Sequence, residues 1–413
     1  MPLNTFFPIF VSAGLVIFAH GLYGILVPVR AQIEGFSPTA IGVIATGFAF
    51  GFTAGCFYIP RLVSKVGHIR AFGAISSVLS CSIILSIMFI SPVAWFITRV
   101  IAGACIAGTF MIMESWLNER TTNSNRGSVF SIYMIISQTG LLVGQFVLAL
   151  DDPKEAILFL VAAMAFSFAV LPTAVTGVQS PAPLSKVSIN IRELYDNSQV
   201  AVVGSFLAGI IAGAWVSFAP VFGQQVGFST TEIASMMGAA MVGGICFQYP
   251  IGRLSDRVDR RMVMIGCGIA GAIFGSMLYG VSQSSGADSW MFYAVVFLLG
   301  SVLFTIYSLF VAHAHDYSSD FVATSSGLLV IYGVGTMVGP LATAYLLETV
   351  GPSGLFAVTS ISHIGIAIFA TYRLFRRAQP DDLETTDFQT IGLARTNTPH
   401  TYGFDPRSEE ESS

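Results

Sequence analysis

The segment Gly35–Ile41, with the sequence Gly-Phe-Ser-Pro-Thr-Ala-Ile, recurs 192 residues later as Gly-Phe-Ser-Thr-Thr-Glu-Ile at Gly227–Ile233. Three further matches keep the same spacing: Gly51 with Gly243, Arg61-Leu62 with Arg253-Leu254, and Lys65 with Arg257. Because the similarity continues in register from an apolar stretch into a polar loop, which hydropathy alone does not dictate, we interpret it as an internal repeat.

The sequence around these segments is too apolar for a soluble protein. Of the 413 residues, 54% are hydrophobic and 10% are charged, whereas soluble domains carry roughly 25% charged residues. Twelve stretches lack Asp, Glu, Lys and Arg, and all but one reach the roughly 18 to 20 residues that cross a bilayer as a helix. The exception, residues 100–113, is extended by residues 93–98 and interrupted only by Arg99. We therefore predict an all-α membrane protein with twelve transmembrane helices.

The positive charges predict the orientation in the membrane. If the spans alternate in direction, sixteen of the nineteen Lys and Arg residues fall on the side that carries both termini. Because cytoplasmic loops are enriched in Lys and Arg, we expect both termini in the cytoplasm and the protein in a bacterial inner membrane. Both copies of the repeat then start outside and run inward. The two halves are thus expected to be parallel six-helix repeats, a pattern found in secondary transporters.

The sequence divides into four predicted parts. Two six-helix halves, at residues 1–175 and 199–375, flank a cytoplasmic central loop at residues 176–198, the longest internal connection. Residues 376–413 are the fourth part, and from residue 378 onward they hold eight acidic residues, two basic residues and few large apolar ones. This composition predicts a disordered acidic cytoplasmic tail.

The loop after the second copy of the repeat carries the most specific motif. Residues Gly252–Arg261 read Gly-Arg-Leu-Ser-Asp-Arg-Val-Asp-Arg-Arg. This resembles the G-x-x-x-D-R-x-G-R-R loop signature of the major facilitator superfamily, with Asp259 in place of the later glycine. The first-half copy is degenerate, with Ser64 in the position of the acid and Lys65 after it. The family normally keeps the stronger copy in the first half, so we expect the gating role of this loop to be shifted to the second half.

The resemblance implies a cytoplasmic gate. In the family geometry, the carboxylate of Asp256 would accept hydrogen bonds at the positive amino end of the fifth span, which starts at Arg126. The arginines of the motif would face anionic headgroups. For Arg260 and Arg261, a role in fixing the topology alone is an equal alternative. The expected gating residues are Gly252, Asp256, Arg257, Arg260, Arg261, Lys65 and Arg126.

Other segments also resemble the family. Arg99–Gly103 is similar to its R-x-x-Q-G pattern, with Ala102 in place of the glutamine. Glu114–Arg120 and Tyr307–Asp316 resemble a bacterial subgroup of these transporters whose substrates are largely undefined. The resemblance covers about residues 6–375 and implies transport by alternating access.

Two ionisable residues lie deep in the predicted spans. Arg99 lies about 9 Å inside the outer end of the fourth span, and His20 lies roughly 10 Å inside that of the first. An intramembrane cation faces the interior of the bundle and is a functional candidate, although Arg99 could instead satisfy backbone carbonyls near the outer gate. An imidazole titrates near neutral pH, so His20 is either a proton carrier or a packed polar residue.

Glu114 and Trp215 complete the candidate site. Glu114 follows Arg99 by fifteen residues, near the inner end of the fourth span. It is either a coupling carboxylate or the structural partner of a loop arginine. Trp215, near the outer end of the seventh span, is either an interface anchor or a stacking surface that faces a cavity.

No motif predicts a cofactor or a metal site. The phosphate-binding loop G-x-x-x-x-G-K-[ST] is absent, so nothing suggests ATP hydrolysis. Gly266–Gly271 matches G-x-G-x-x-G, but it lies inside an apolar span and follows no strand, unlike a dinucleotide site. His313 and His315 are two residues apart and do not share a helix face. The short loops leave no room for a soluble enzyme domain, so we expect no enzymatic activity.

These features together predict a secondary active transporter that moves a small organic solute, with proton coupling through His20, Arg99 and Glu114. A transporter-like sensor of a small ligand and an uncoupled facilitator are the alternatives. The expected partners are the solute, protons and the lipid bilayer, without nucleic acid. We expect a monomer.

Overall fold

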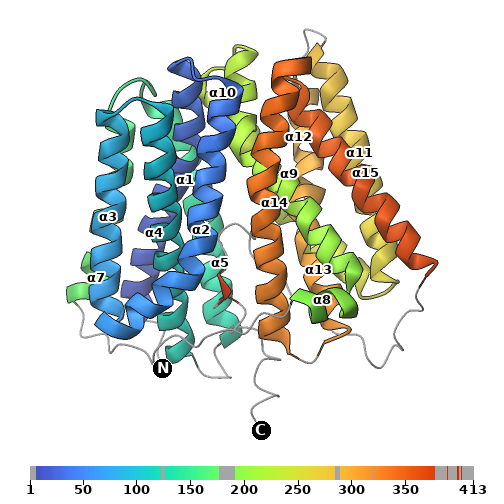
Figure 1. Cartoon of the computed structure of the whole chain (residues 1–413), viewed down its shortest axis with the longest axis horizontal. Helices are drawn as coiled ribbons and strands as arrows, with labels where there is room; N and C mark the ends of the chain where they lie inside the picture. The colour runs from blue at the N-terminus through green and yellow to red at the C-terminus, as the bar shows by residue number, and fades with distance from the viewer. Residues whose placement is uncertain are drawn as a thin grey trace. The chain divides into compact units, whose positions relative to one another are not determined.

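The structure, a computed structural model, describes residues 6–121, 126–175, 191–283, 289–318, 320–376, 388, 398, 399 and 401 (Figure 1). Within these residues the regular secondary structure is helical. Twelve helical segments among them are long and apolar enough to cross a membrane. The predicted all-α fold class with twelve spans is therefore confirmed.

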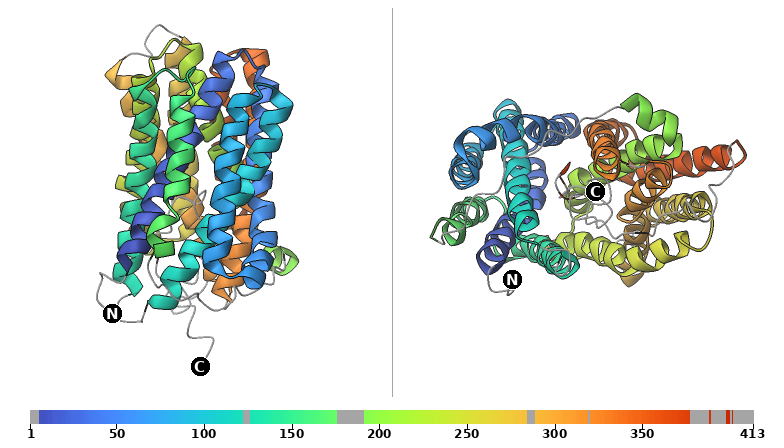
Figure 2. Two further views of the ribbon diagram at one scale, coloured as in Figure 1. Left: turned by 90° about the vertical axis from the view of Figure 1, so that its left-hand side faces the viewer. Right: turned by 90° about the horizontal axis from the view of Figure 1, so that it is seen from below.

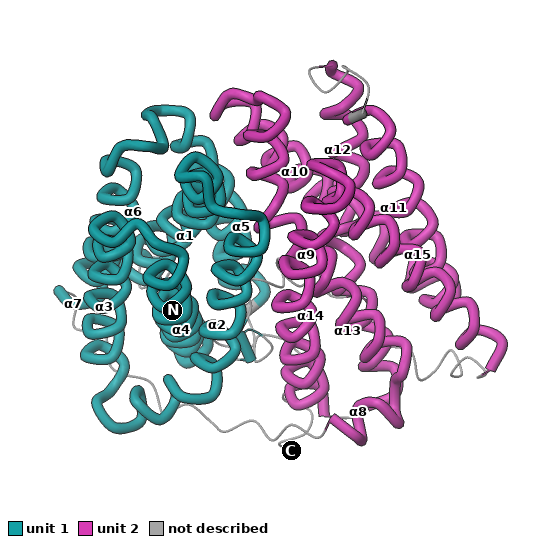
Figure 3. The backbone as a smooth tube through the Cα atoms, turned by 45° about the horizontal axis from the view of Figure 1, so that its top comes forward, with its two compact units in different colours: residues 1–187, 396–413 teal, residues 188–395 magenta. Residues whose placement is uncertain are grey.

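The chain forms two compact units (Figure 3). Unit 1 contains residues 1–187 and 396–413, and unit 2 contains residues 188–395. The helices of unit 1 are α1 (Phe7–Ile33), α2 (Pro38–Val66), α3 (His68–Met88), α4 (Pro92–Arg120), α5 (Arg126–Phe146), the 3-10 helix η2 (Val147–Leu150), α6 (Ile157–Phe168) and α7 (Leu171–Val175). Those of unit 2 are α8 (Ile191–Asn197), α9 (Gln199–Gln225), α10 (Thr230–Ser255), α11 (Arg260–Gln283), α12 (Trp290–Leu303), α13 (Ile306–His315), α14 (Phe321–Val350) and α15 (Gly354–Leu374). Each unit thus holds six of the twelve candidate spans.

The second span of each unit begins in the same way. Gly35 and Gly227 have φ angles of 74° and 88°, in the left-handed region that glycine enters without steric cost. Two residues later, Ser37 and Ser229 cap α2 and α10, and each side-chain oxygen accepts a hydrogen bond from a backbone N–H of the first turn. The repeated sequence is therefore a glycine turn followed by a serine cap, and the two helices begin 192 residues apart.

The helices of the two units also pair in the same order. In unit 1, α4 packs against α2 and α3, and α1 packs against α5 and α6. In unit 2, α12 packs against α10 and α11, and α9 packs against α14 and α15. Figure 2 shows these helices from the side and end on. The same pairing in the same chain order confirms that the second six-helix unit repeats the arrangement of the first.

Glycines bring equivalent helices into backbone contact. A Cβ on Gly103 of α4 would lie 2.2 Å from the carbonyl oxygen of Phe48 on α2. A Cβ on Gly300 of α12 would lie 1.9 Å from the carbonyl oxygen of Ala240 on α10. Only glycine permits such close approach of two helices. Because Phe48 and Ala240 are 192 residues apart, the repeat extends to the contact between the second and fourth span of each unit.

Candidate functional site

Arg99 lies inside unit 1, against two aromatic rings. Its side chain is on α4 and is 8% exposed. The guanidinium carbon lies 4.2 Å from the ring centre of Phe48 on α2 and 5.0 Å from that of Tyr23 on α1. None of the ion pairs between described residues includes Arg99, and its Nε has no hydrogen-bond partner among them. The guanidinium group therefore lies against the π faces of both rings.

The contact of Gly103 on α4 with the backbone of α2 also positions Arg99. Residues four apart lie on one face of a helix, so Arg99 and Gly103 face α2 together. The backbone contact of Gly103 with Phe48 fixes the distance between the two helices. Arg99, one turn away on α4, is thereby placed over the Phe48 ring.

His20 shares the Phe48 ring with Arg99. The imidazole of His20, on α1, is buried and stacks on Phe48 with 5.8 Å between ring centres and 20° between ring planes. The ring of Phe110 on α4 meets the same imidazole edge on, also at 5.8 Å. The two residues predicted to lie at the same depth are thus neighbours in one aromatic cluster. The cluster comprises Arg99, His20, Phe48, Tyr23 and Phe110.

Glu114 lies elsewhere in unit 1. Fifteen residues separate it from Arg99 on α4, which is about 22 Å along the helix axis. Its side chain is buried. Thr398 Oγ1 donates a hydrogen bond to Glu114 Oε2, and Thr401 Oγ1 donates to Glu114 Oε1 at 2.8 Å. The hydroxyl of Tyr133 on α5 lies beside the same carboxylate. No ion pair between described residues includes Glu114.

Trp215 lies in unit 2 rather than in the cluster around Arg99. It is on α9, and its side chain is fully buried. The indole Nε1 has no hydrogen-bond partner among the described residues. Trp215 therefore contributes a large apolar surface to the interior of unit 2.

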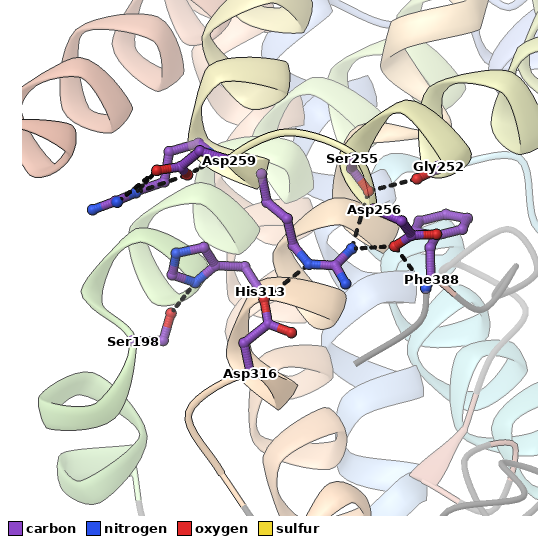
Figure 4. A network of polar contacts seen from close by, with 10 residues as sticks. Ser198, Gly252, Ser255, Asp256, Asp259, His313, Asp316 and Phe388 are labelled. Atoms are coloured by element: carbon purple, nitrogen blue, oxygen red, sulfur yellow. Dashed lines mark hydrogen bonds and ion pairs between the residues drawn. The ribbon is translucent and has the colours of Figure 1, made fainter. Parts of the chain in front are cut away.

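The motif Gly252–Arg261 forms a polar network at the end of α10 (Figure 4). Arg260 Nη1 lies 3.0 Å from Asp256 Oδ1 and 3.0 Å from Ser255 Oγ, and Arg260 Nε lies 2.8 Å from Asp316 Oδ2. Ser255 Oγ donates to the carbonyl oxygen of Gly252 at 2.6 Å. Arg260 and Asp316 are both buried in this network.

Gly252 and Asp256 also contact a residue near the carboxyl end. The backbone N–H of Phe388 donates to Asp256 Oδ1 at 2.9 Å. A Cβ on Gly252 would lie 2.2 Å from the Phe388 ring, so the first glycine of the motif leaves room for that ring. All of these residues belong to unit 2 (Figure 4).

Arg261 pairs with the residue that replaces the later glycine of the signature. Arg261 Nη2 lies 2.6 Å from Asp259 Oδ2, and Arg261 Nη1 donates to the carbonyl oxygen of Arg373 on α15 at 3.3 Å. Partial burial acts to raise the pKa of Asp259, but the hydrogen bonds and positive charge of Arg261 outweigh it and hold this pKa below its usual value. The substitution of glycine by Asp259 thus supplies a local counter-charge for Arg261.

The other expected gating residues are Arg257, Lys65 and Arg126. The side chains of Arg257 and Lys65 are exposed. Arg126 is the first residue of α5, and its side chain lies outside the described residues. The central loop through residue 190, and the tail apart from residues 376, 388, 398, 399 and 401, also lie outside them.

His313 and His315, at the C-terminal end of α13, contact serine hydroxyls. His313 Nδ1 lies 2.9 Å from Ser198 Oγ, and His315 Nε2 lies 2.7 Å from Ser325 Oγ. Within the described part of the chain, no group of three or more His, Cys, Asp or Glu residues has the arrangement of a metal site.

The aromatic partners of Arg99 and the threonine partners of Glu114 were missed by sequence reasoning. Phe48, Tyr23 and Phe110 are ordinary apolar residues of charge-free stretches, and their sequence context carries no functional signal. Thr398 and Thr401 lie in a polar tail almost 300 residues from Glu114. The glycine at position 103 is the one local signal, because it marks the face of α4 that approaches α2.

Comparison with known proteins gives the family. Residues 9–331 and, in a second match, residues 200–399 fit the model of the Major Facilitator Superfamily. The chain belongs to the major facilitator superfamily. Among curated members, it is 26% identical over 356 residues to the "Uncharacterized MFS-type transporter YcaD" of Escherichia coli strains UMN026 and K12 / DH10B, covering 85% of this chain and 91% of those proteins.

Solved structures of major facilitator transporters share the fold. The nucleoside transporter NupG matches with a TM-score of 0.74 and 14% identity, over 92% of this chain and 100% of that one. A D-xylose-proton symporter matches with a TM-score of 0.66 and 13% identity, over 96% of this chain and 100% of that one. These structures share the fold of the chain, and the family match makes it a multi-pass membrane transporter of the major facilitator type, and not an enzyme.

Proposed function

We propose that the protein is a secondary active transporter that moves a small organic solute by alternating access, coupled to protons. In this proposal, the six-helix halves at residues 1–175 and 199–375 rock about a central site, joined by the cytoplasmic loop at residues 176–198. The acidic tail at residues 376–413 and both termini are cytoplasmic, in a bacterial inner membrane. The segregation of positive charges and the parallel repeats support this arrangement.

Arg99 carries the proposal. It is a buried cation with no carboxylate in ion-pair contact among the described residues, and it rests on the rings of Phe48 and Tyr23. Such a group inside a membrane protein is available to a negative or polar group that enters from outside. We assign to Arg99 the binding of that group of the solute.

His20 and Glu114 are the proposed proton-carrying groups. His20 shares the Phe48 ring with Arg99, so a charge change on the imidazole acts on the same site as the solute. Glu114 lies further along α4 toward its C-terminal end. Histidine and glutamate side chains inside membrane spans are the usual members of proton relays.

The cytoplasmic gate is assigned to the loop motif of unit 2. Asp256, Arg260 and Gly252 form one network, and Arg261 is anchored by Asp259. The exposed Arg257 and Lys65, together with Arg126, complete the proposed gate. Their positive charges suit contact with anionic headgroups on the cytoplasmic face.

Proteoliposome transport tests the proposal. A thermal-shift screen of metabolites identifies a solute, and a trapped pH-sensitive dye then reports solute-driven proton flux. We expect Arg99→Ala to lower this flux by roughly tenfold or more, because a hydrogen bond to a charged group contributes about 1.5–3 kcal/mol.

The matched control is Arg61→Ala. Arg61 also lies over an aromatic ring, with its guanidinium carbon 5.4 Å from the ring centre of Tyr58, but it is exposed near the end of α2. We expect its flux to equal that of the wild type. If Arg99→Ala retains full proton-coupled flux, Arg99 has no place in the mechanism.

A further inference from the structure

The surroundings of Glu114 differ from those of a structural ion pair. Its carboxylate is buried and accepts hydrogen bonds from the hydroxyl groups of Thr398 and Thr401, and the hydroxyl of Tyr133 lies beside it. The usual partner of a buried carboxylate is a cation. Here the site instead satisfies the carboxylate with neutral hydrogen-bond donors.

Thr398 and Thr401 are held so that they donate as a pair. The backbone N–H of Thr401 donates to the carbonyl oxygen of Thr398 at 3.0 Å, and the backbone N–H of Thr398 donates to Thr401 Oγ1 at 2.9 Å. This turn fixes both hydroxyls on one side of the segment. Each hydroxyl then donates to a different oxygen of Glu114. The carboxylate is bound by two neighbouring hydroxyls at once.

The two threonines are almost completely removed from solvent. Thr398 is 0% exposed and Thr401 is 4% exposed, although the tail around them is polar and acidic. Burial of a polar residue is favourable only when its hydrogen bonds are made. The threonines therefore lie buried in unit 1, with Glu114 as the hydrogen-bond acceptor that they share.

We propose that Glu114 marks a binding site for a neutral solute with two adjacent hydroxyl groups, and that Thr398 and Thr401 occupy this site as an internal competitor. A diol presents the same pair of donors to the two carboxylate oxygens. Its binding must displace the threonines, so the carboxyl-terminal segment lowers the apparent affinity for the solute. That this ligand is the transported solute rests on the proposed function. The competition between the ligand and the two threonines for Glu114 does not.

Chemical labelling of Glu114 tests, without any added ligand, whether Thr398 and Thr401 occupy the site. Dicyclohexylcarbodiimide is an apolar reagent that modifies carboxyl groups, and peptide mass spectrometry measures the modified fraction of Glu114 in the purified full-length protein. We expect Thr398→Val/Thr401→Val to react several times faster than the wild type, because valine keeps the shape of threonine but donates no hydrogen bond. Thr398→Ser/Thr401→Ser keeps both hydroxyls and should react like the wild type. Equal rates of Glu114 modification in all three proteins would show that Thr398 and Thr401 do not occupy the site.

Polyol binding tests the ligand class. Erythritol, xylitol and myo-inositol are titrated against the full-length proteins, and the affinity is taken from thermal shifts. We expect the double valine variant to bind at least one of them roughly tenfold tighter than the wild type, since loss of a hydrogen bond to a charged group weakens the competitor by about that factor. Adding Glu114→Gln to the double valine variant should abolish the shift, which excludes a general solvent effect of polyols.

The remaining outcomes each decide against the proposal. Equal polyol affinity in the wild type and the double valine variant would overturn the competition. Binding of 1,3-diaminopropane in place of the polyols, or of neither, would overturn the diol class. Should the double variant not fold, Thr401→Val alone carries the same test. None of these measurements uses a proton gradient or depends on Arg99. The competition at Glu114 can therefore be disproved while the proposed transport function stands, and the transport function can be disproved while the competition stands.

Discussion

Arg260 is the residue whose replacement should most strongly destabilise unit 2. Its guanidinium group joins Asp316, at 2.8 Å, to Asp256, at 3.0 Å. The Asp316 side chain is 4% exposed, and that of Asp256 is 26% exposed. Arg260→Met removes the cation from both ion pairs and leaves the buried carboxylate of Asp316 without this counter-charge.

The two ion pairs should contribute unequally. Removing one partner of a buried ion pair costs about 3–5 kcal/mol, because the other charge stays buried. An exposed pair contributes roughly 0–1 kcal/mol, and Asp256 is the more exposed of the two carboxylates. We therefore expect Arg260→Met to lower the free energy of unfolding by about 3–5 kcal/mol, most of it through Asp316. Asp256→Asn should cost roughly 1 kcal/mol or less.

A double-mutant cycle measures this difference. The free energy of unfolding is obtained by denaturant titration in detergent for the wild type, Arg260→Met, Asp316→Asn and the double variant. We expect the double variant to be more stable than Arg260→Met, because the amide of Asn removes the buried negative charge that has lost its ion pair with Arg260. Arg257→Met is the matched control, since Arg257 is an exposed arginine of the same motif, and its effect should stay within about 0.5 kcal/mol. A loss of less than about 1 kcal/mol for Arg260→Met, or no recovery in the double variant, would refute this reasoning.

Two further predictions concern packing and pH. Gly103→Ala should destabilise unit 1 by about 1–3 kcal/mol, because the added Cβ cannot fit against α2. The control is Gly266→Ala, whose added Cβ meets nothing within 4 Å and should not destabilise the protein. Equal unfolding midpoints for the two variants would contradict this prediction. The pKa of Asp259 is lower in the folded protein than in the unfolded chain. The pairing of Asp259 with Arg261 therefore stabilises the fold fully at pH values above the unfolded-state pKa of about 3.9. This stabilisation is lost as the pH falls through the folded-state pKa of Asp259. The free energy of unfolding of Asp259→Asn should therefore be lower than that of the wild type at neutral pH, and the difference should shrink as the pH falls. A difference that does not shrink in acid would disprove the assignment.

The spans and the repeat could be predicted from sequence because each depends on local patterns. Charge-free stretches set the twelve helical segments, and a positive-φ glycine followed by a serine cap sets the start of α2 and of α10. Such signals act over a few residues. They need no knowledge of which helix faces which.

The candidate site could be predicted only in part. Arg99 and His20 stand out as ionisable groups in apolar spans, and the structure brings both against Phe48. Phe48 itself could not be selected, because the rotation of α2 about its axis decides which of its many apolar residues faces inward. The pairing of Glu114 with Thr401 spans 287 residues, and no periodicity or composition records a contact at that separation.

The contacts of Gly103 with Phe48 and of Gly300 with Ala240 are made by main chain against main chain. The spacing of these helices therefore does not depend on the size of the side chains that line the interior. Substitutions at Tyr23 or Phe110 can change the shape and polarity around Arg99 while the framework keeps its dimensions. A lineage carrying this framework can diverge in the compounds it recognises by exchanging single interior residues, without evolving a new way to assemble its helices.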